Sequence, residues 1–377
     1  MEFPPLDRSS SKWRRFPSDV LPMHVAEMDF DVAAEIRDVI IAMTNRSDLG
    51  YLGPIPEVAQ EFAKYAKRYW DWEIAKPQLK LATDVGVAAV EILRVLTKPG
   101  DKVLVNFPVY SSIQGWIAEV GCLPHDAPLI RDGETWRLDL AAIEAAFRSG
   151  VSVYMLCSPQ NPVGRIHTRE ELSAVAKLAR EYDAVVISDE IHAPLSWEKF
   201  TPYLGLGEDA ELTGVVISSS SKAWNTAGLK AAFFITQSEV MAQKLKGMPE
   251  AMHWRTSLLG GFAMAASFGT ATDWLDKTVA EIKSNYEFLR SELRTQIPKA
   301  RLAEMTSTYL AWIDLSEYEI EDPAKEILHS GRVSLVPGVD HGGGELYRKF
   351  VRLNFATTRE RISEAVRRMA LVLEGKN

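Results

Sequence analysis

Short runs of consecutive apolar residues alternate with segments of helical periodicity through the middle of the chain. The apolar runs occupy residues 102–106, 152–157, 184–188, 215–218 and 231–235. Between them, the apolar positions of 87–96 and 170–182 recur about every 3.6 residues, which predicts helices. Apolar strands separated by helices are typical of a parallel or mostly parallel sheet that is covered on both faces. The pattern therefore predicts an α/β fold.

The beginning of the chain has a different pattern. Prolines interrupt it repeatedly, at Pro4, Pro5, Pro17 and Pro22. Because proline disrupts both helix interiors and sheet ladders, we expect an irregular arm here. A short helix is predicted over 33–43, and a longer helix with regular apolar spacing is predicted over 56–69.

The last third of the chain changes character again. A long helix is predicted over 273–295, and alternating strands are predicted over 309–315 and 350–355. A final helix follows, and the spacing of Thr357 and Glu360 at its start is that of a capping box. The predicted division is an N-terminal arm of residues 1–45 that joins the small domain, a large domain over 46–275, and a small α+β domain over 276–377.

Composition narrows the class of protein. Of the 377 residues, 46% are hydrophobic and 25% are charged, which argues against a disordered or fibrous chain. The net charge of −8 provides no general attraction for nucleic acid or for an anionic membrane. Two cysteines, Cys122 and Cys157, are too few for a disulfide framework. The sequence shows no secretory signal, and its apolar runs are much shorter than the roughly 18 to 20 residues needed to span a bilayer. We therefore expect a soluble cytoplasmic protein.

Polar side chains follow three of the predicted strands. Asn161 comes after the second apolar run, Asp189 after the third, and Lys222 after the fourth, behind a row of serines. Taken singly, these are a turn amide, a solvated acid and a surface lysine. In open α/β sheets, however, ligands bind beyond the carboxyl ends of the strands. Three such residues at one edge therefore predict a ligand site.

The chemistry of these residues suits one kind of ligand. A lysine behind serines can form a Schiff base with a phosphorylated aldehyde, while the hydroxyl groups donate to the phosphate. A carboxylate such as Asp189 can keep the pyridine nitrogen of pyridoxal phosphate protonated. Residues 83–86 precede a predicted helix whose first amides suit a phosphate. Neither a zinc-ligand spacing nor a nucleophile elbow is present in the sequence.

Further segments, spread over nearly the whole chain, match the pattern of a known family. They are residues 21–30, 50–51, 107–110, 158–164, 188–194, 219–230, 307–312 and 351–355. On these segments the chain resembles the fold-type I pyridoxal-phosphate enzymes of the aspartate aminotransferase superfamily. Within that superfamily it is most similar to the cystathionine β-lyase (C–S lyase) branch of the MalY/PatB type. The segments around Lys222, Asp189 and Asn161 are specific for the fold type, whereas 189–192 and 307–312 point more weakly to the lyase branch.

The resemblance implies a role for each residue around the cofactor, pyridoxal 5′-phosphate. Lys222 would form the Schiff base and later move protons, and Asp189 would pair with the pyridine nitrogen. Asn161 would hydrogen-bond the 3′ oxygen, and Tyr110 would stack on the ring. The phosphate would be held by Ser219, Ser221, Lys230 and the backbone of Val85 and Gly86.

Three further residues complete the implied site. Tyr51 would reach the phosphate of the neighbouring subunit, which implies a homodimer with shared active sites. Arg352 would bind the substrate α-carboxylate as a bidentate fork, which lysine does poorly. His192 would lie near the cofactor, although a structural histidine is an equal alternative. His24 and Glu27 stand where the branch commonly has tryptophan and aspartate, so side-chain preference is open.

The resemblance implies β-elimination of L-cysteine thioethers such as cystathionine, which gives a thiol, pyruvate and ammonia. An aminotransferase is the alternative, because both reactions need the same cofactor, lysine and arginine and differ only in substrate orientation. A regulatory protein that binds a partner is a third reading. The intact set of Lys222, Asp189, Asn161 and Arg352 argues against the loss of catalysis, and no basic helix-turn-helix segment indicates DNA binding.

Overall fold

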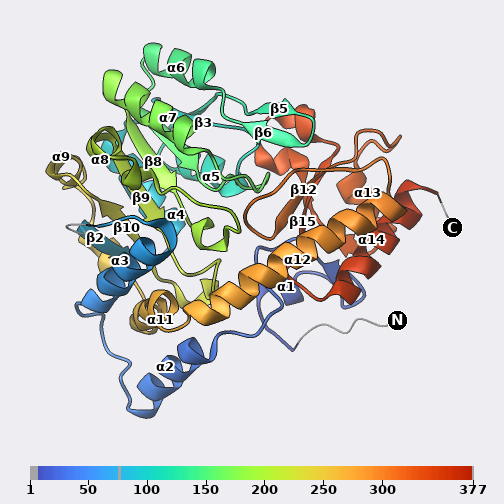
Figure 1. The fold of residues 1–377 in the computed structure, drawn as a ribbon, viewed down its shortest axis with the longest axis horizontal. Coiled ribbons are helices and arrows are strands. Elements are labelled where there is room, and N and C mark those ends of the chain that lie inside the picture. Colours follow the sequence, from blue (N-terminus) through green and yellow to red (C-terminus); the bar gives the residue numbers. More distant parts are fainter. Residues whose placement is uncertain (1–6, 75–77, 376–377) are drawn as a thin grey trace.

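The computed structural model describes residues 7–74 and 78–375. Within these residues, a sheet of seven strands runs through the structure (Figure 1). From edge to edge its strands are β2 (Gln78–Ala82), β10 (Ala232–Thr236), β9 (Gly214–Ser218), β8 (Val185–Asp189), β7 (Val153–Cys157), β3 (Lys102–Val105) and β4 (Leu123–Asp126). Neighbouring strands are parallel except at β10, which runs antiparallel to β2 and β9. The prediction of a mostly parallel sheet is confirmed.

Helices flank this sheet, as the alternating pattern predicts (Figure 1). They are α3 (Pro56–Trp70), α4 (Val85–Leu96), α5 (Ser111–Glu119), α6 (Leu140–Arg148), α7 (Arg169–Glu181), α8 (Glu208–Thr213), α9 (Glu239–Lys244), α10 (Glu250–Trp254) and α11 (Leu258–Gly269). Helix α7 packs against α6, α8 and β8, while α4 packs against α5, β9 and β10. Strands β7, β8, β9 and β10 are buried along their whole length, which explains why each reads as a continuous apolar run.

A second, antiparallel sheet lies in the C-terminal third. Its strand order is β11 (Arg301–Leu302), β12 (Leu310–Asp314), β15 (Phe350–Asn354) and β14 (Val336–Pro337). Its helices are α12 (Thr272–Gln296), α13 (Pro323–His329) and α14 (Arg359–Leu373), and α12 packs along α14. The predicted long helix and both predicted strands are confirmed. The expected domain boundary after residue 275 falls near the start of α12, and the division into domains stays a prediction.

The N-terminal arm lies against this C-terminal third (Figure 1). It contains α1 (Ser11–Arg14) and β1 (Leu21–Pro22), which pairs in parallel with β13 (Val333–Ser334). The predicted helix over 33–43 is α2 (Ala34–Asn45), which packs on α11 at the edge of the molecule. Pro4 and Pro5, which helped to predict the arm, lie outside the described residues.

The remaining elements are short. They are the hairpin β5 (Ile130–Asp132) with β6 (Thr135–Arg137), and the 3₁₀ turns η1 (Ala193–Leu195), η2 (Tyr203–Leu206), η3 (Ala227–Leu229), η4 (Gly338–His341) and η5 (Gly344–Tyr347). Across residues 7–74 and 78–375, no helix has both the length and the apolar character of a membrane span.

The predicted capping box at the start of the last helix is wrong. The N-cap of α14 is Thr358, whose hydroxyl accepts a hydrogen bond of 3.4 Å from the N–H of Arg361. Thr357 is buried, and its hydroxyl donates to the Asp29 carboxylate at 2.5 Å. Two successive threonines can both cap a helix, and here the contact with the arm decided which one does. A complete capping box occurs instead at α7, between Thr168 and Glu171.

Candidate active site

One cavity collects the polar residues that follow the central strands. It has a volume of about 280 Å³ and lies where the chain leaves β7, β8 and β9. The predicted residues in its wall are Val85, Gly86, Tyr110, Asn161, Asp189, His192, Ser221, Lys222 and Lys230. The amide, the acid and the lysine that follow three separate strands thus meet at one place, as the sheet topology predicts.

Lys222 lies in the loop after β9, and its amine is at the cavity wall. Its Nζ donates a hydrogen bond of 3.4 Å to the backbone carbonyl of Ala26 in the arm. Burial and the nearby Arg352 guanidinium lower the pKa of the amine to about 8, while Asp189 acts in the opposite direction. The neutral form, which attacks a carbonyl carbon, is therefore far more abundant than in an exposed lysine.

Asp189 is the last residue of β8, and its carboxyl group is buried in the cavity wall. One carboxyl oxygen accepts a hydrogen bond of 3.2 Å from the N–H of Ile191. Burial raises the pKa of the carboxyl to about 7, although Ile191 and the Lys222 ammonium oppose this shift. A buried carboxyl whose hydrogen bond in the described structure comes from a neutral backbone N–H favours a cationic ligand. The protonated nitrogen of a pyridine ring is such a cation.

Arg352 lies in the middle of β15, behind Asn161 rather than in the cavity wall. One terminal nitrogen donates to Asn161 Oδ1 and the other to the carbonyl of His24, both at 3.3 Å. Its Nε has no hydrogen-bond partner among the described residues. Burial lowers the pKa of the guanidinium to about 10. A buried cation held only by neutral oxygens is suited to receive an anion such as a carboxylate.

The start of α4 forms another part of the cavity wall. Val85 and Gly86 are its first residues, and Asp84 caps the helix by accepting a hydrogen bond of 2.8 Å from the N–H of Val87. A Cβ atom on Gly86 would lie 2.9 Å from the indole nitrogen of Trp116, so this turn has room only for glycine. Helix N-termini attract anions through their free amides and dipole. This end therefore suits a phosphate.

Lys230 pairs with Asp84 at this part of the cavity wall. The distance from its Nζ to the Asp84 carboxylate is 3.1 Å, and both side chains are well exposed to solvent. Exposed ion pairs of this kind contribute little to stability, about 0 to 1 kcal/mol. Lys230 can therefore turn from Asp84 toward an anion at small cost.

Two predicted phosphate ligands lie outside the cavity wall of this chain. The hydroxyl of Ser219 donates to the carbonyl of Ala231 at 2.7 Å and accepts from the N–H of Ser221 at 3.0 Å. Ser219 therefore shapes the loop before Lys222. Tyr51 lies between α2 and α3 with 97% of its surface exposed, and it does not line the cavity.

His192 lines the cavity as a neutral ring. Its Nδ1 lies 3.0 Å from the hydroxyl of Thr308, and its ring meets that of Tyr309 edge-on at 6.3 Å. Burial, together with the Lys222 and Arg352 charges, lowers the pKa of His192 to about 3. A histidine with so low a pKa acts as a hydrogen-bonding group and stays uncharged near neutral pH.

Several wall residues were missed by the sequence analysis. They are Ala26, Asp84, Ser112, Trp116, Cys157, Ile191, Ala227 and Ala231. Only Asp84 had a local signal, because aspartate before a helix is a common N-cap. Glu190 is also buried, with its pKa raised to about 8 by burial, yet it faces away from the cavity and accepts from Ser188 and Tyr203. Because adjacent positions in extended chain point to opposite sides, only one of two neighbouring acids faces the cavity.

Fold and cavity together define an aminotransferase-like α/β enzyme of fold type I. Residues 18–369 match the family described as "Aminotransferase class I and II", and the chain belongs to this family. A Corynebacterium glutamicum protein named cystathionine beta-lyase is 31% identical, with 99% of this chain and 100% of that protein covered. Cystathionine beta-lyase PatB of Bacillus subtilis is 28% identical, with coverage of 94% and 93%.

A solved structure has nearly the same fold. Cystalysin from Treponema denticola, whose crystal structure contains pyridoxal 5′-phosphate, matches this chain with a TM-score of 0.93. The match covers 100% of this chain and 98% of cystalysin at 23% sequence identity. At this identity the likeness concerns the fold alone.

Proposed function

We propose that the protein is a pyridoxal-phosphate-dependent β-lyase that cleaves the C–S bond of L-cysteine thioethers, cystathionine among them. The observation that carries the proposal is the pair of buried groups, the Lys222 amine and the Asp189 carboxyl, that line one cavity together with a helix N-terminus. The relatives named as cystathionine beta-lyases support the choice of reaction.

The residues present fit the proposed cofactor. The Asp189 carboxyl has no cationic partner within hydrogen-bond reach in the described structure, and the pyridine nitrogen would provide one. The first amides of α4, with Ser221 and Lys230, would hold the phosphate. Tyr110, half-buried in the wall, would lie against the ring. The bound cofactor supplies a ring that accepts the electron pair left at Cα when a proton is removed.

The remaining steps belong to side chains of this chain. Arg352 would exchange its neutral partners Asn161 and His24 for the substrate carboxylate and so orient the substrate. The Lys222 amine would then take the proton from Cα, which its lowered pKa favours. Departure of the β-sulfur as a thiol leaves a three-carbon product that water converts to pyruvate and ammonia.

The reaction itself can be tested with the cofactor-loaded enzyme. L-Cystathionine should give pyruvate and a free thiol in equal amounts with no keto acid added. L-Methionine is the control, because its sulfur is attached to Cγ and β-elimination cannot release it. Conversion of the cofactor to its amine form without pyruvate would instead identify an aminotransferase.

We further propose that the active enzyme is a homodimer in which Tyr51 reaches the partner's phosphate. Two apolar side chains that precede Tyr51 in the chain are well exposed, Ile41 on α2 at 49% and Leu49 after it at 58%. Tyr51 itself is almost completely exposed and follows α2, which extends to the edge of the molecule (Figure 1). Exposed apolar side chains of this kind are typical of a surface that a partner molecule covers.

Replacing Tyr51 by phenylalanine should weaken cofactor binding about 10- to 150-fold, because a hydrogen bond to a charged group is worth about 1.5 to 3 kcal/mol. Cofactor titration of the cofactor-free protein measures this, and sedimentation with and without cofactor shows whether binding favours the dimer. Tyr182→Phe is a matched control, because that hydroxyl contacts Glu144 away from the cavity. Unchanged affinity in Tyr51→Phe, or a monomer that binds cofactor normally, would contradict the shared site.

A further inference from the structure

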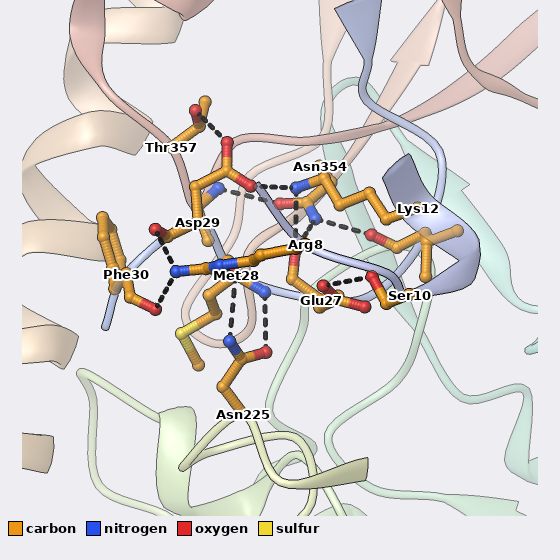
Figure 2. A network of polar contacts seen from close by, with 12 residues as sticks. Arg8, Ser10, Lys12, Glu27, Met28, Asp29, Phe30, Asn225, Asn354 and Thr357 are labelled. Atoms are coloured by element: carbon orange, nitrogen blue, oxygen red, sulfur yellow. Dashed lines mark hydrogen bonds and ion pairs between the residues drawn. The ribbon is translucent and has the colours of Figure 1, made fainter. Parts of the chain in front are cut away.

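A segment of the arm passes between the two residues that are central to the proposed reaction. This segment, His24–Met28, is called the strap here. It belongs to no helix or strand, yet both of its ends are attached to the C-terminal third. The N–H of Met23 donates to Ser334 at 3.0 Å, and that of Asp29 donates to Ala356 at 2.9 Å. Figure 2 shows the polar contacts around the second half of the strap.

Side chains from other segments donate to every carbonyl of the strap. Arg352 donates to the carbonyl of His24 at 3.3 Å, and Lys222 donates to that of Ala26 at 3.4 Å. Asn354 donates to the carbonyls of Val25 and Glu27 at 2.6 and 2.7 Å, and Lys12 also donates to that of Glu27 at 2.9 Å. The carbonyl of Met28 accepts from Asn225 at 2.9 Å and from Arg8 at 3.0 Å. Buried backbone groups need partners, and here side chains replace the neighbouring strand of a sheet. The path of the strap is therefore determined by its carbonyl groups more than by its own side chains.

Two asparagines hold the strap from opposite sides (Figure 2). Asn225 accepts from the N–H of Met28 and donates to the carbonyl of the same residue, both at 2.9 Å, as a paired strand would. Asn354 is buried and donates to two strap carbonyls, while its oxygen accepts from Ala356 at 2.8 Å. Asn225 shares a loop with Lys222, and Asn354 shares β15 with Arg352.

A buried ion pair secures the end of the strap. Lys12 and Asp29 are 2.6 Å apart, and their side chains are only 1% and 7% exposed. Thr357 donates to the same carboxylate at 2.5 Å. Removing one member of a buried pair leaves an uncompensated charge in the interior, which is strongly unfavourable. The anchor is therefore rigid, and displacement of the strap relative to β15 is opposed.

We propose that the strap sets the separation between Lys222 and Arg352, with Asn225 and Asn354 as positioning residues. The proposal rests on the proposed function, in which one amino acid must reach both residues at the same time. The distance between the amino group and the carboxylate of the substrate is fixed. The substrate therefore cannot adjust if the distance between Lys222 and Arg352 changes. A misplacement of about 1 Å can cost about 100-fold in rate.

The test uses cofactor-loaded protein and two matched ligands. L-Alanine has both the amino group and the carboxylate but no β-leaving group, whereas propionate is the same molecule without the amino group. Binding of L-alanine is followed by the change in cofactor absorbance, and binding of propionate by its competition with L-alanine. Cofactor affinity of each variant is measured separately.

The variants remove one asparagine at a time. Asn225 has a φ of 58°, so Asn225→Gly removes its side chain without strain in the backbone. Asn354→Ala removes the donor on the other side. Each should weaken L-alanine binding about 100-fold, while affinity for propionate and for the cofactor stays unchanged. Ser10→Ala is the control, because the Ser10 hydroxyl donates to the Glu27 carboxylate at 2.7 Å, and its removal leaves every strap carbonyl bonded.

Equal losses for L-alanine and propionate would overturn the proposal, because they would indicate general damage to the Arg352 site. Unchanged L-alanine binding in Asn225→Gly would overturn it as well, even if the buried Asn354→Ala variant does not fold. A wild-type protein that takes up the cofactor but binds neither ligand would reject the proposed function, and this proposal with it. Weaker binding of L-alanine alone, with unchanged binding of propionate, would support the proposal that the strap sets the separation between Lys222 and Arg352.

Discussion

Replacing Lys222 by alanine is expected to lower the rate of pyruvate formation from L-cystathionine by at least about 10⁴-fold, because one side chain acts as both nucleophile and base. The protein should still fold, since Lys222 lines the cavity and its hydrogen bond in the described structure is a long contact of 3.4 Å with the carbonyl of Ala26. Cofactor retained through its phosphate contacts should lack the absorbance of a lysine Schiff base. Steady-state assays and absorbance spectra measure both.

A surface lysine provides the control. Lys177 is exposed on α7, and Lys177→Ala should change neither rate nor spectrum. Multiple turnovers by Lys222→Ala would show that another residue is the base. In the wild type, the pKa of about 8 predicts that cofactor uptake by the cofactor-free protein becomes faster as the pH approaches that value and levels off above it.

Replacing Asp189 by asparagine should have opposite effects on activity and on stability. Activity should fall about 100- to 1,000-fold, because a buried charge placed against the ring nitrogen is lost. The gain in stability of the cofactor-free protein should begin above about pH 4, the ordinary pKa of an aspartate, and be complete above about pH 7. Burial raises the pKa of this carboxyl in the folded protein, so ionisation at higher pH opposes folding, and a neutral amide removes that penalty.

Glu190→Gln is the matched control for this prediction. Glu190 is an equally buried neighbour whose pKa is also raised, to about 8, but it does not line the cavity. Its replacement should share the gain in stability at high pH without the large loss of activity. Thermal melts of the cofactor-free proteins at several pH values measure the change in stability, and pyruvate assays measure the change in activity. An equal loss of activity in both variants would contradict a specific role of Asp189.

The central part of the site could be predicted because it depends on local pattern and on one topological rule. Each of Asn161, Asp189 and Lys222 directly follows an apolar run, and parallel strands bring such positions to one edge. Residues 83–86 gained meaning only after the other residues had predicted a phosphorylated ligand, and the helix begins at Val85 and not at the predicted residue 87. The assignment of Tyr110 and Arg352 came from resemblance and not from spacing.

The sequence by itself determined the elements, the mostly parallel sheet and the residues at its carboxyl edge, because these follow from periodicity and neighbouring residues. Only the tertiary structure decided which partners meet across long distances in the chain. It brought the Arg352 guanidinium to the side chain of Asn161, and it paired the Thr357 hydroxyl with Asp29 so that Thr357 does not cap the helix. It also brought the carbonyl of Ala26 in the strap to the Lys222 amine. Each of these contacts joins residues nearly two hundred positions or more apart, and neither local periodicity nor neighbouring residues indicate such pairs.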